Sequence, residues 1–249
     1  MDNSLLVSLS QQLAAYRSMD VIANNLANIS TPGFKRESAK FEEYITRVAP
    51  SEGQTGMQSV SFVKDAGVSR DLSQGNVQTT GAPFDFAING NGYFVVQTPQ
   101  GMRYTRDGHF TLDANGQVVN SDGYALQGDS GAITITPADT NVHVGQDGII
   151  SSTVNGLASQ IGKLQVVDFA NERTLVKEGA NLYSTSQTPT TAANATIGQG
   201  MLESSNVQSV LEISHMIEVM RAYQATASLS QSQEDMIRQA VTRLGATPN

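Results

Sequence analysis

Residues 23–35 read ANNLANISTPGFK, and this stretch decides how the sequence is divided. From Leu5 to about Ile29, apolar residues recur at steps of three, four or seven, which is typical of one amphipathic helix. Pro32 removes a backbone donor and disfavours helix at the preceding residue, while Gly33 accepts backbone angles that other residues avoid. The helix is therefore expected to end here, where a different structure begins.

The asparagines of this stretch are unusual for the solvated side of a helix. On a helical wheel, at about 100° per residue, Asn24 and Asn28 fall opposite the apolar side and Asn25 falls at its edge. Asparagine is a poor helix former, and its amide offers donors and acceptors that suit a neighbour made of peptide groups. Two interpretations remain open at this point, a solvated back or a face that contacts another protein segment.

A second helical pattern runs from about Val207 to Leu244. Apolar residues from Ile213 onward follow alternating steps of three and four, and Ser230 and Glu234 interrupt them. Such a helix would be roughly 57 Å long at 1.5 Å per residue, which is too long to cover one small β module. We therefore expect the two terminal helices to pair with each other.

The sequence pattern in the middle of the chain predicts β structure. Residues 46–80 indicate loops with isolated strands, and residues 184–200 are small and polar, as in an exposed connector. From Gly81 to about Tyr183, short apolar runs alternate with turn dipeptides spaced roughly 8–12 residues apart, which is typical of an all-β module. The clearest expected hairpin is MRYTRDGHFTLD, residues 102–113. The turn dipeptides are Asn89-Gly90, Asn91-Gly92, Asp107-Gly108, Asn115-Gly116, Asp122-Gly123 and Asp147-Gly148.

The expected fold class is α+β, with a discontinuous, coiled-coil-like helical stem from both termini and a mainly antiparallel all-β head. The expected division places an N-terminal stem helix in residues 1–33 and an extended linker with short strands in residues 34–80. A β domain is expected in residues 81–200, and a C-terminal stem helix that pairs with the first is expected in residues 201–249.

Composition and charge narrow the function classes. A net charge of -8 argues against nucleic acid as a partner, because its phosphates require clustered Lys and Arg. The absence of cysteine excludes thiol catalysis, cysteine-based zinc sites and disulfides. No segment approaches the ~20 apolar residues of a membrane span, and Asp2 stands where a secretory signal carries positive charge. Neither membrane insertion nor a cleavable signal peptide is expected.

No metal or cofactor site is expected. The histidines His109, His143 and His215 lie far apart, and there is no HExxH motif. Asp113 begins a segment that starts like a calcium loop, but Tyr124 stands at the twelfth position, where an acidic ligand is needed.

An enzyme is not expected either. Asp85, Asp107 and Asp113 could supply a pair of carboxylates for glycoside hydrolysis. All three lie at turns or strand ends, where Asp is favoured in any case. A hydrolase acting on the cell wall is therefore kept only as an alternative from a different functional class.

Three blocks of sequence resemble the rod and hook axial proteins of the bacterial flagellum. ANNLANISTPGFKRESAKFEEY, residues 23–44, is similar to their N-terminal signature, and GMLESSNVQSVLEISHMIEVMRAYQATASL, residues 200–229, is similar to their C-terminal signature. Residues 75–96 and 102–128 resemble the β segment shared by the rod proteins. The modest length favours a proximal-rod member, with distal-rod and hook members as alternatives, although Thr226 stands where many members carry Asn.

The resemblance implies a structural subunit that is exported unfolded by the flagellar type III apparatus. Copies of such a subunit and other rod proteins then form a hollow helical shaft that crosses the periplasm. It also implies signature positions for assembly or for packing of the stem, and burial within one chain remains an alternative for Leu26, Val207 and Tyr223. These positions are Asn24, Asn25, Leu26, Asn28, Gly33, Phe34, Glu203, Asn206, Val207, Arg221, Tyr223 and Gln224.

Overall fold

The computed structural model describes residues 3–48, 58–154 and 156–245. The chain forms two compact units. The first, here called the helical unit, consists of Met1–Ala27, Glu37–Asp71 and Gln208–Asn249. The second, here called the β unit, consists of Asn28–Arg36 and Leu72–Val207. The chain therefore passes from one unit to the other several times, and each unit is built from segments that are distant in sequence.

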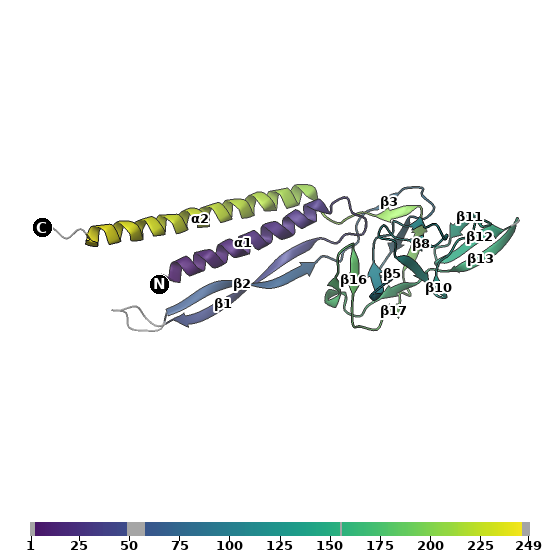
Figure 1. Cartoon of the computed structure of the whole chain (residues 1–249), viewed down its shortest axis with the longest axis horizontal. Coiled ribbons are helices and arrows are strands. Elements are labelled where there is room, and N and C mark those ends of the chain that lie inside the picture. Colours follow the sequence, from purple (N-terminus) through teal and green to yellow (C-terminus); the bar gives the residue numbers. More distant parts are fainter. Residues whose placement is uncertain (1–2, 49–57, 155, 246–249) are drawn as a thin grey trace. The chain divides into compact units, whose positions relative to one another are not determined.

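The helical unit contains two helices and a two-stranded ribbon (Figure 1). Helix α1 (Asn3–Ala27) lies between helix α2 (Ser209–Gly245) and the ribbon, which is formed by β1 (Glu37–Val48) and β2 (Gln58–Arg70). The helices run antiparallel, so that the end of α1 lies beside the beginning of α2. Helices α1 and α2 thus contact each other within the helical unit.

The ribbon replaces the loops and isolated short strands expected in this part of the chain. Its two strands pair along their whole length, with Glu42 opposite Lys64 and Tyr44 opposite Phe62. Opposite charges and aromatic pairs of this kind stabilise antiparallel strands. A register shift after Lys40 marks a β-bulge in the pairing.

Helix α1 ends at Ala27, before the expected boundary at residue 33. The next residues form turns that belong to the β unit, where the Thr31 N–H donates to the Asn28 carbonyl at 3.2 Å. Gly33 has a φ of 67°, and a Cβ there would lie 2.4 Å from the carbonyl carbon of Arg106. The position requires glycine both for its backbone angle and for this close approach.

Antiparallel pairing accounts for every named strand of the β unit. The largest sheet has the order β15-β16-β6-β5-β9-β8-β7, with β10 on β9 and β14 joining β5 to β17. A three-stranded sheet has the order β11-β12-β13, and β18-β4 and β19-β3 form pairs. The strands are β3 (Val77–Thr79), β4 (Phe86–Asn89), β5 (Tyr93–Thr98), β6 (Gly101–Thr105), β7 (Thr111–Leu112), β8 (Val118–Val119), β9 (Ala125–Gly128), β10 (Gly131–Ala132), β11 (Thr140–Val144), β12 (Ile149–Val154), β13 (Leu157–Lys163), β14 (Val166–Asp168), β15 (Val176–Lys177), β16 (Leu182–Ser184), β17 (Thr190–Thr191), β18 (Thr196–Gln199) and β19 (Met201–Glu203), with one 3-10 turn, η1 (Glu172–Thr174).

The core of the β unit lies on both faces of β5. Phe94 and Val96 point into the larger apolar cluster, while Tyr93 and Val95 point into a second cluster. A strand that is buried on both faces is continuously apolar, as the YFVV run of β5 is. The unit thus has a closed apolar interior, and together the two units give the α+β fold that the sequence predicts.

The hairpin expected at residues 102–113 is not formed. Strand β6 pairs with β5 and β16, while β7 pairs with β8. Gly108, in the expected turn, instead lies against β4, where an added Cβ would lie 1.6 Å from the Phe86 carbonyl oxygen. The Asp107-Gly108 pair therefore serves a close backbone approach rather than a tight hairpin.

Candidate assembly interface

Asn25 joins three segments of the helical unit. Its side chain is completely buried, and its Oδ1 accepts from the Glu37 N–H at 2.9 Å. Its Nδ2 donates to the Glu37 carbonyl at 2.7 Å and to Glu212 Oε2 at 3.0 Å. The amide thus pairs with the backbone of β1 as a neighbouring strand would, and it binds a buried carboxylate of α2 as well. This contact fixes the register of α1 against both neighbours.

The three asparagines of the opening stretch occupy three different environments. Asn25, expected at the edge of the apolar side, is the buried one. Asn24 is exposed on α1, and Asn28 is half-buried in the β unit, where its Oδ1 accepts from Thr31 Oγ1 at 3.2 Å. Of the two interpretations left open by the sequence, a protein neighbour therefore holds for Asn25, exposure to solvent holds for Asn24, and Asn28 is intermediate.

Glu203 forms the centre of a second buried polar group, in the β unit. Its Oε1 lies 2.6 Å from Lys35 Nζ and accepts from the Gly75 N–H at 3.0 Å. Its Oε2 lies 3.0 Å from Arg106 Nη2, in an ion pair whose angles are not those of a hydrogen bond. Arg106 also donates to two backbone carbonyls, of Gly90 and Gly92. We call Lys35, Arg106 and Glu203 the charged clasp.

The charged clasp is nearly inaccessible to solvent. Lys35, Arg106 and Glu203 are 3 %, 6 % and 2 % exposed. Burial lowers the pKa of the Lys35 ammonium, and the neighbouring Glu203 carboxylate opposes that change. A buried ion pair gives little net stability compared with apolar packing, but removal of one partner leaves the other charge unpaired at a large cost. The charged clasp therefore favours one specific arrangement of its three side chains.

Backbone hydrogen bonds connect the segments of the charged clasp to other signature residues. The Gly33 N–H donates to the Glu203 carbonyl at 2.7 Å, and the Asn206 N–H donates to the Phe34 carbonyl at 3.4 Å. The Asn206 side chain accepts from the Arg36 N–H at 2.7 Å. Phe34 is 1 % exposed, and the Lys177 ammonium lies 4.3 Å from its ring centroid. Segments far apart in the sequence are thus joined inside one chain.

The structure distributes the expected interface residues between both units rather than gathering them in one site. In the β unit, Gly33, Phe34, Glu203 and Val207 are buried, whereas Asn28 and Asn206 are half-buried. In the helical unit, Leu26 and Tyr223 are half-buried beside the buried Asn25, whereas Asn24, Arg221 and Gln224 are exposed.

Sequence reasoning missed several members of these groups. Lys35 directly follows Phe34, and Arg106 ends the RYTR segment, but nothing local to either residue indicates burial. Glu212 carries a weak signal, because it lies four residues before Met216 on the apolar side of the second helix. A carboxylate at such a position requires a polar partner, and Asn25 supplies one.

The candidate catalytic residues serve local structure. Asp85 accepts from Thr80 Oγ1 at 2.6 Å and lies 2.8 Å from His109 Nδ1. Asp113 accepts from the N–H groups of Asn115 and Gln117, as expected for a turn. Burial raises the pKa of the Asp107 carboxyl, which accepts from the His109 N–H. In the part of the chain that the structure describes, no three His, Asp or Glu side chains are grouped to hold a metal ion.

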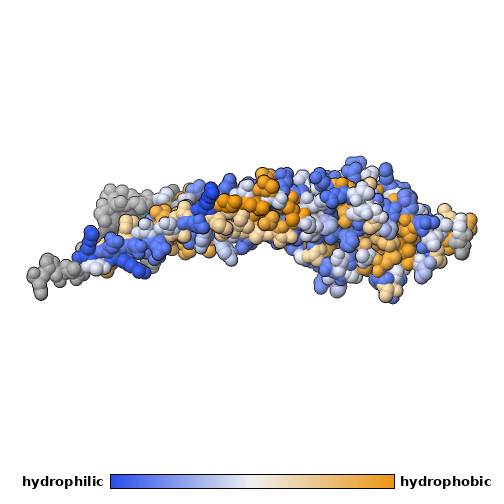
Figure 2. Space-filling view, turned by 90° about the horizontal axis from the view of Figure 1, so that it is seen from above, coloured by the Kyte–Doolittle hydropathy of each residue, from blue (hydrophilic) through white to orange (hydrophobic). Residues whose placement is uncertain are grey.

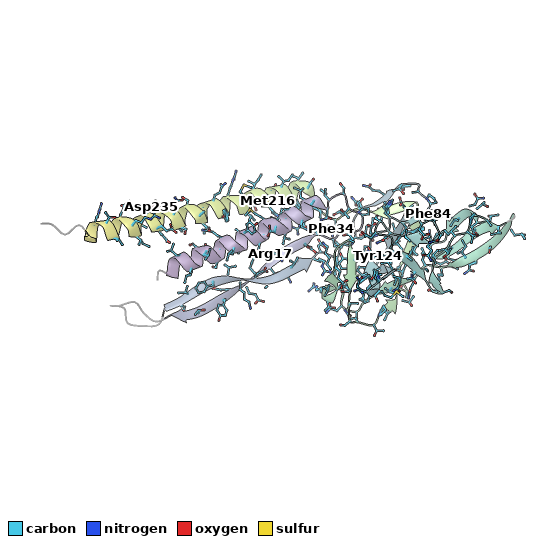
Figure 3. All side chains as sticks on the ribbon, viewed as in Figure 1. Arg17, Phe34, Phe84, Tyr124, Met216 and Asp235 are labelled. Carbon is cyan, nitrogen blue, oxygen red and sulfur yellow. The ribbon has the colours of Figure 1, made fainter. Side chains whose placement is uncertain are left out.

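The helical unit exposes much apolar surface (Figure 2). On α1 the exposed large side chains are Leu6, Leu9, Leu13 and Tyr16, between 47 % and 62 % accessible. Arg17, which follows them, points to the ribbon, with Nε 3.1 Å from Asp65 Oδ2 (Figure 3). On α2 the exposed large side chains are Val210, Leu211, Ile213, Ile217, Met220, Leu229, Met236, Ile237 and Val241. Neither helix, over its described residues, is apolar enough to cross a membrane.

Three family models match separate parts of the chain. Residues 5–35 match "Flagella basal body rod protein", residues 87–152 match "Flagellar hook protein FlgE/F/G D1 domain", and residues 199–243 match "Flagellar basal body rod FlgEFG protein C-terminal". The matches follow the order of the blocks recognised in the sequence, and the first and last cover most of α1 and α2.

Curated relatives match over nearly their whole length. The flagellar basal-body rod protein FlgF of Caulobacter vibrioides is 42% identical, over 98% of this chain and 99% of the relative. The rod protein FlgG of Buchnera aphidicola subsp. Schizaphis graminum is 36% identical, over 94% and 97%. FlgF of Mesorhizobium japonicum is 33% identical, over 99% of both chains. These relatives cover both helices and the β unit. The chain therefore belongs to the flagellar basal-body rod protein family.

Proposed function

We propose that the chain is a structural subunit of the flagellar basal-body rod, the hollow drive shaft that crosses the periplasm and transmits torque. The observation that carries this proposal is the 42% identity to a FlgF rod protein along essentially the entire length of both chains. The chain polymerises helically with copies of itself and with other rod proteins, and it reaches the rod through the flagellar type III export apparatus without a cleavable signal peptide.

The apolar surface of the helices supports an assembling role. Monomeric soluble proteins rarely expose long apolar patches, and such patches mark contacts with other proteins. Helices α1 and α2 form a coiled-coil-like stem in this proposal, and their exposed faces contact neighbouring subunits. Asn24, Arg221 and Gln224 are the signature residues exposed on these helices, and they contribute to the same contacts.

A position in the proximal rod is proposed within the family. The 42% identity to FlgF of Caulobacter vibrioides favours it over a distal-rod position, for which the 36% identity to a FlgG protein is the corresponding observation. A hook position is the further alternative. The hydrolase alternative lacks support, because Asp85, Asp107 and Asp113 are engaged in turn and strand contacts.

Labelling in isolated basal bodies tests the proposal. A chain with a small epitope tag replaces the natural copy in its own bacterium, and basal bodies are purified and examined by immunogold electron microscopy. We expect label on the proximal part of the rod and loss of motility on deletion. Label on the distal rod or hook would move the subunit to another level, and motile cells without any labelled basal body would contradict the proposal.

A double substitution separates folding from assembly. We expect Asn24→Leu together with Asn28→Leu to leave the β unit folded, measured by its circular dichroism and unfolding midpoint, but to impair motility. Both side chains carry an amide with donors and an acceptor, which leucine cannot replace. Normal motility in the double variant would contradict a role in assembly for these asparagines.

A further inference from the structure

Helix α1 has three sides, and two of them have partners among the residues that the structure describes. Ser10 and Arg17 face the ribbon, where Ser10 Oγ accepts from the Val63 N–H and Arg17 binds Asp65. Asn25 faces α2, where it binds Glu212. The third side carries Leu6, Leu9, Leu13 and Tyr16, at steps of three, four and three. We call these four residues the α1 stripe.

Helix α2 carries a stripe with the same spacing. Glu212 binds Asn25 of α1, and the less exposed Met216, Val219 and Tyr223 follow it along the same line of the helix at steps of three and four. At about 100° per residue, Val210, Ile213, Ile217 and Met220 lie roughly 120° away from that line, again at steps of three, four and three. They are between 45 % and 74 % exposed. We call these four residues the α2 stripe.

The two stripes match each other in chemistry and length. Neither contains a charged side chain, and α1 has no Asp, Glu, Lys or Arg before Arg17. A helix side that faces water is normally built from charged residues, so these neutral apolar stripes indicate a protein neighbour. Each stripe spans about 15 Å, and side chains at steps of three and four interlock when two helices pack. The chain thus carries both halves of one helix–helix contact.

The two halves cannot meet within one chain. The contact between Asn25 and Glu212 fixes the register of the helix pair. Counted from that contact at 1.5 Å per residue, the centre of the α1 stripe lies about 21 Å along the pair and the centre of the α2 stripe about 5 Å along it. The stripes are therefore offset by about 16 Å along the helix axis. A second copy is needed to bring them level.

We propose that the α1 stripe of one copy packs on the α2 stripe of the next, which is displaced by about 16 Å along the helix axis. The proposal rests on the proposed function, since it names the contact by which the helices assemble. The contact is heterologous, because it uses a different surface on each copy. Such a contact leaves one stripe free at each end and builds an open helical filament when the rotation between copies does not close a ring.

Disulfide trapping tests the contact directly, because the chain has no cysteine of its own. Two differently tagged copies are expressed together in the bacterium, one with Leu13→Cys and the other with Ile213→Cys, positions that the displacement brings opposite each other. A matched control replaces Ile213→Cys by Leu229→Cys, because Leu229 is also an exposed aliphatic residue of α2 but, at about 100° per residue, lies on another side of the helix. Basal bodies are then isolated, oxidised and examined for a dimer that carries both tags.

We expect the mixed dimer from Leu13→Cys and Ile213→Cys to be at least ten times more abundant than the dimer from the control pair. Equal yields, or no mixed dimer although both copies are present in the basal bodies, would overturn the contact while leaving the rod function intact. A crosslink to a protein of different mass would show that another partner covers the stripe. Absence of even the unsubstituted tagged chain from basal bodies would instead overturn the proposed function.

A charge exchange gives a second test that does not depend on oxidation. Leu9→Glu and Ile217→Lys, which the displacement also brings opposite each other, should each reduce swimming in soft agar at least tenfold. The two changes in the same chain should restore most of the swimming, because every contact then pairs a carboxylate with an ammonium. A double variant that swims no better than the single variants, although all three are folded by circular dichroism, would overturn the contact.

Discussion

The two units of the chain differ in how many apolar side chains they bury. The β unit has a closed apolar core, in which Phe94, Val96 and Leu126 are completely buried. In the helical unit, Val21 and Ile22 are the two large hydrophobic side chains that are buried among the described residues. Its other buried positions are polar, as at Asn25 and Glu212. The difference teaches that the β unit is complete in one chain, whereas the helical unit has apolar surface left for other copies.

Amide hydrogen exchange should show the largest difference between the units. In the dilute, unassembled chain we expect amides of the second half of α2 to exchange about a thousandfold faster than those of β5, because few buried apolar contacts hold that half. Mass spectrometry after timed exchange measures this. Equal protection of α2 and β5 in the dilute chain would show that the helical unit is as self-sufficient as the β unit.

Substitution of Glu203 should cause the largest loss of stability in the β unit. Glu203→Leu leaves Lys35 and Arg106 buried without their carboxylate, and we expect it to lower the free energy of unfolding by about 3–5 kcal/mol. Urea unfolding measures the loss. The matched control is Glu178→Gln, which removes a surface ion pair with Arg103 and should cost far less, because exposed ion pairs contribute little to stability. Similar effects of both variants would contradict the role of the clasp.

The buried asparagine should matter more than its exposed neighbour. Asn25→Leu leaves the Glu37 backbone groups and Glu212 without their amide partner, and we expect it to destabilise the helical unit by about 1–3 kcal/mol for each group left unsatisfied. Asn24→Leu should change stability by less than about 0.5 kcal/mol, because Asn24 is exposed. The helical signal in thermal unfolding measures both. Equal effects would contradict the burial-based distinction.

Gly33 should tolerate alanine poorly. Gly33→Ala combines a positive φ with a methyl group 2.4 Å from the Arg106 carbonyl carbon, and we expect a loss of about 1–3 kcal/mol. Gly123→Ala is the control, because Gly123 has a φ of 82° but no atom within 4 Å of an added Cβ. A loss at Gly33 no greater than at Gly123 would show that the close approach is unimportant.

The smallest effect is expected at Glu172. Burial, followed by repulsion from Asp168, raises the pKa of this half-buried carboxyl above its ordinary value of 4.5. The folded state therefore holds the proton more readily than the unfolded state, so the contribution of Glu172 is present below that value and is lost as the pH rises through the raised pKa. We expect Glu172→Gln to stabilise the β unit at pH 7 by less than about 1 kcal/mol. Unfolding at pH 4 and pH 7 measures this, and destabilisation at pH 7 would contradict it.

Features with a strong period were predictable from the sequence. Both helices follow the spacing of apolar residues, and β5 follows a short apolar run. The β1–β2 ribbon was missed because most of β1 is exposed, so that apolar and polar residues do not alternate along it.

Features that depend on contacts distant in sequence were not predictable. Neither Lys35 nor Arg106 carries a local sign of its pairing with Glu203, which is 168 residues after Lys35. The resemblance to the axial proteins indicated Glu203 and Gly33 as signature residues, but not that they bind each other through the backbone. The hairpin expected at residues 102–113 was wrong for the same reason, because the close approach of Gly108 to the Phe86 backbone involves a residue distant in sequence.

Residues on either side of the ribbon meet at one point in the β unit. Lys35 Nζ donates to the Ser73 carbonyl at 2.8 Å, and Asn206 Nδ2 donates to the same oxygen at 3.0 Å. Residues 37–71 therefore leave the β unit and return to it, and the hydrogen bonds to Ser73 hold the residues at the two ends of this segment close together. The entropy of closing such a segment grows only logarithmically with its length, by about 0.6 kcal/mol for each doubling. Evolution or an engineer can thus lengthen or shorten this segment, to span a different distance, with little effect on the stability of the β unit.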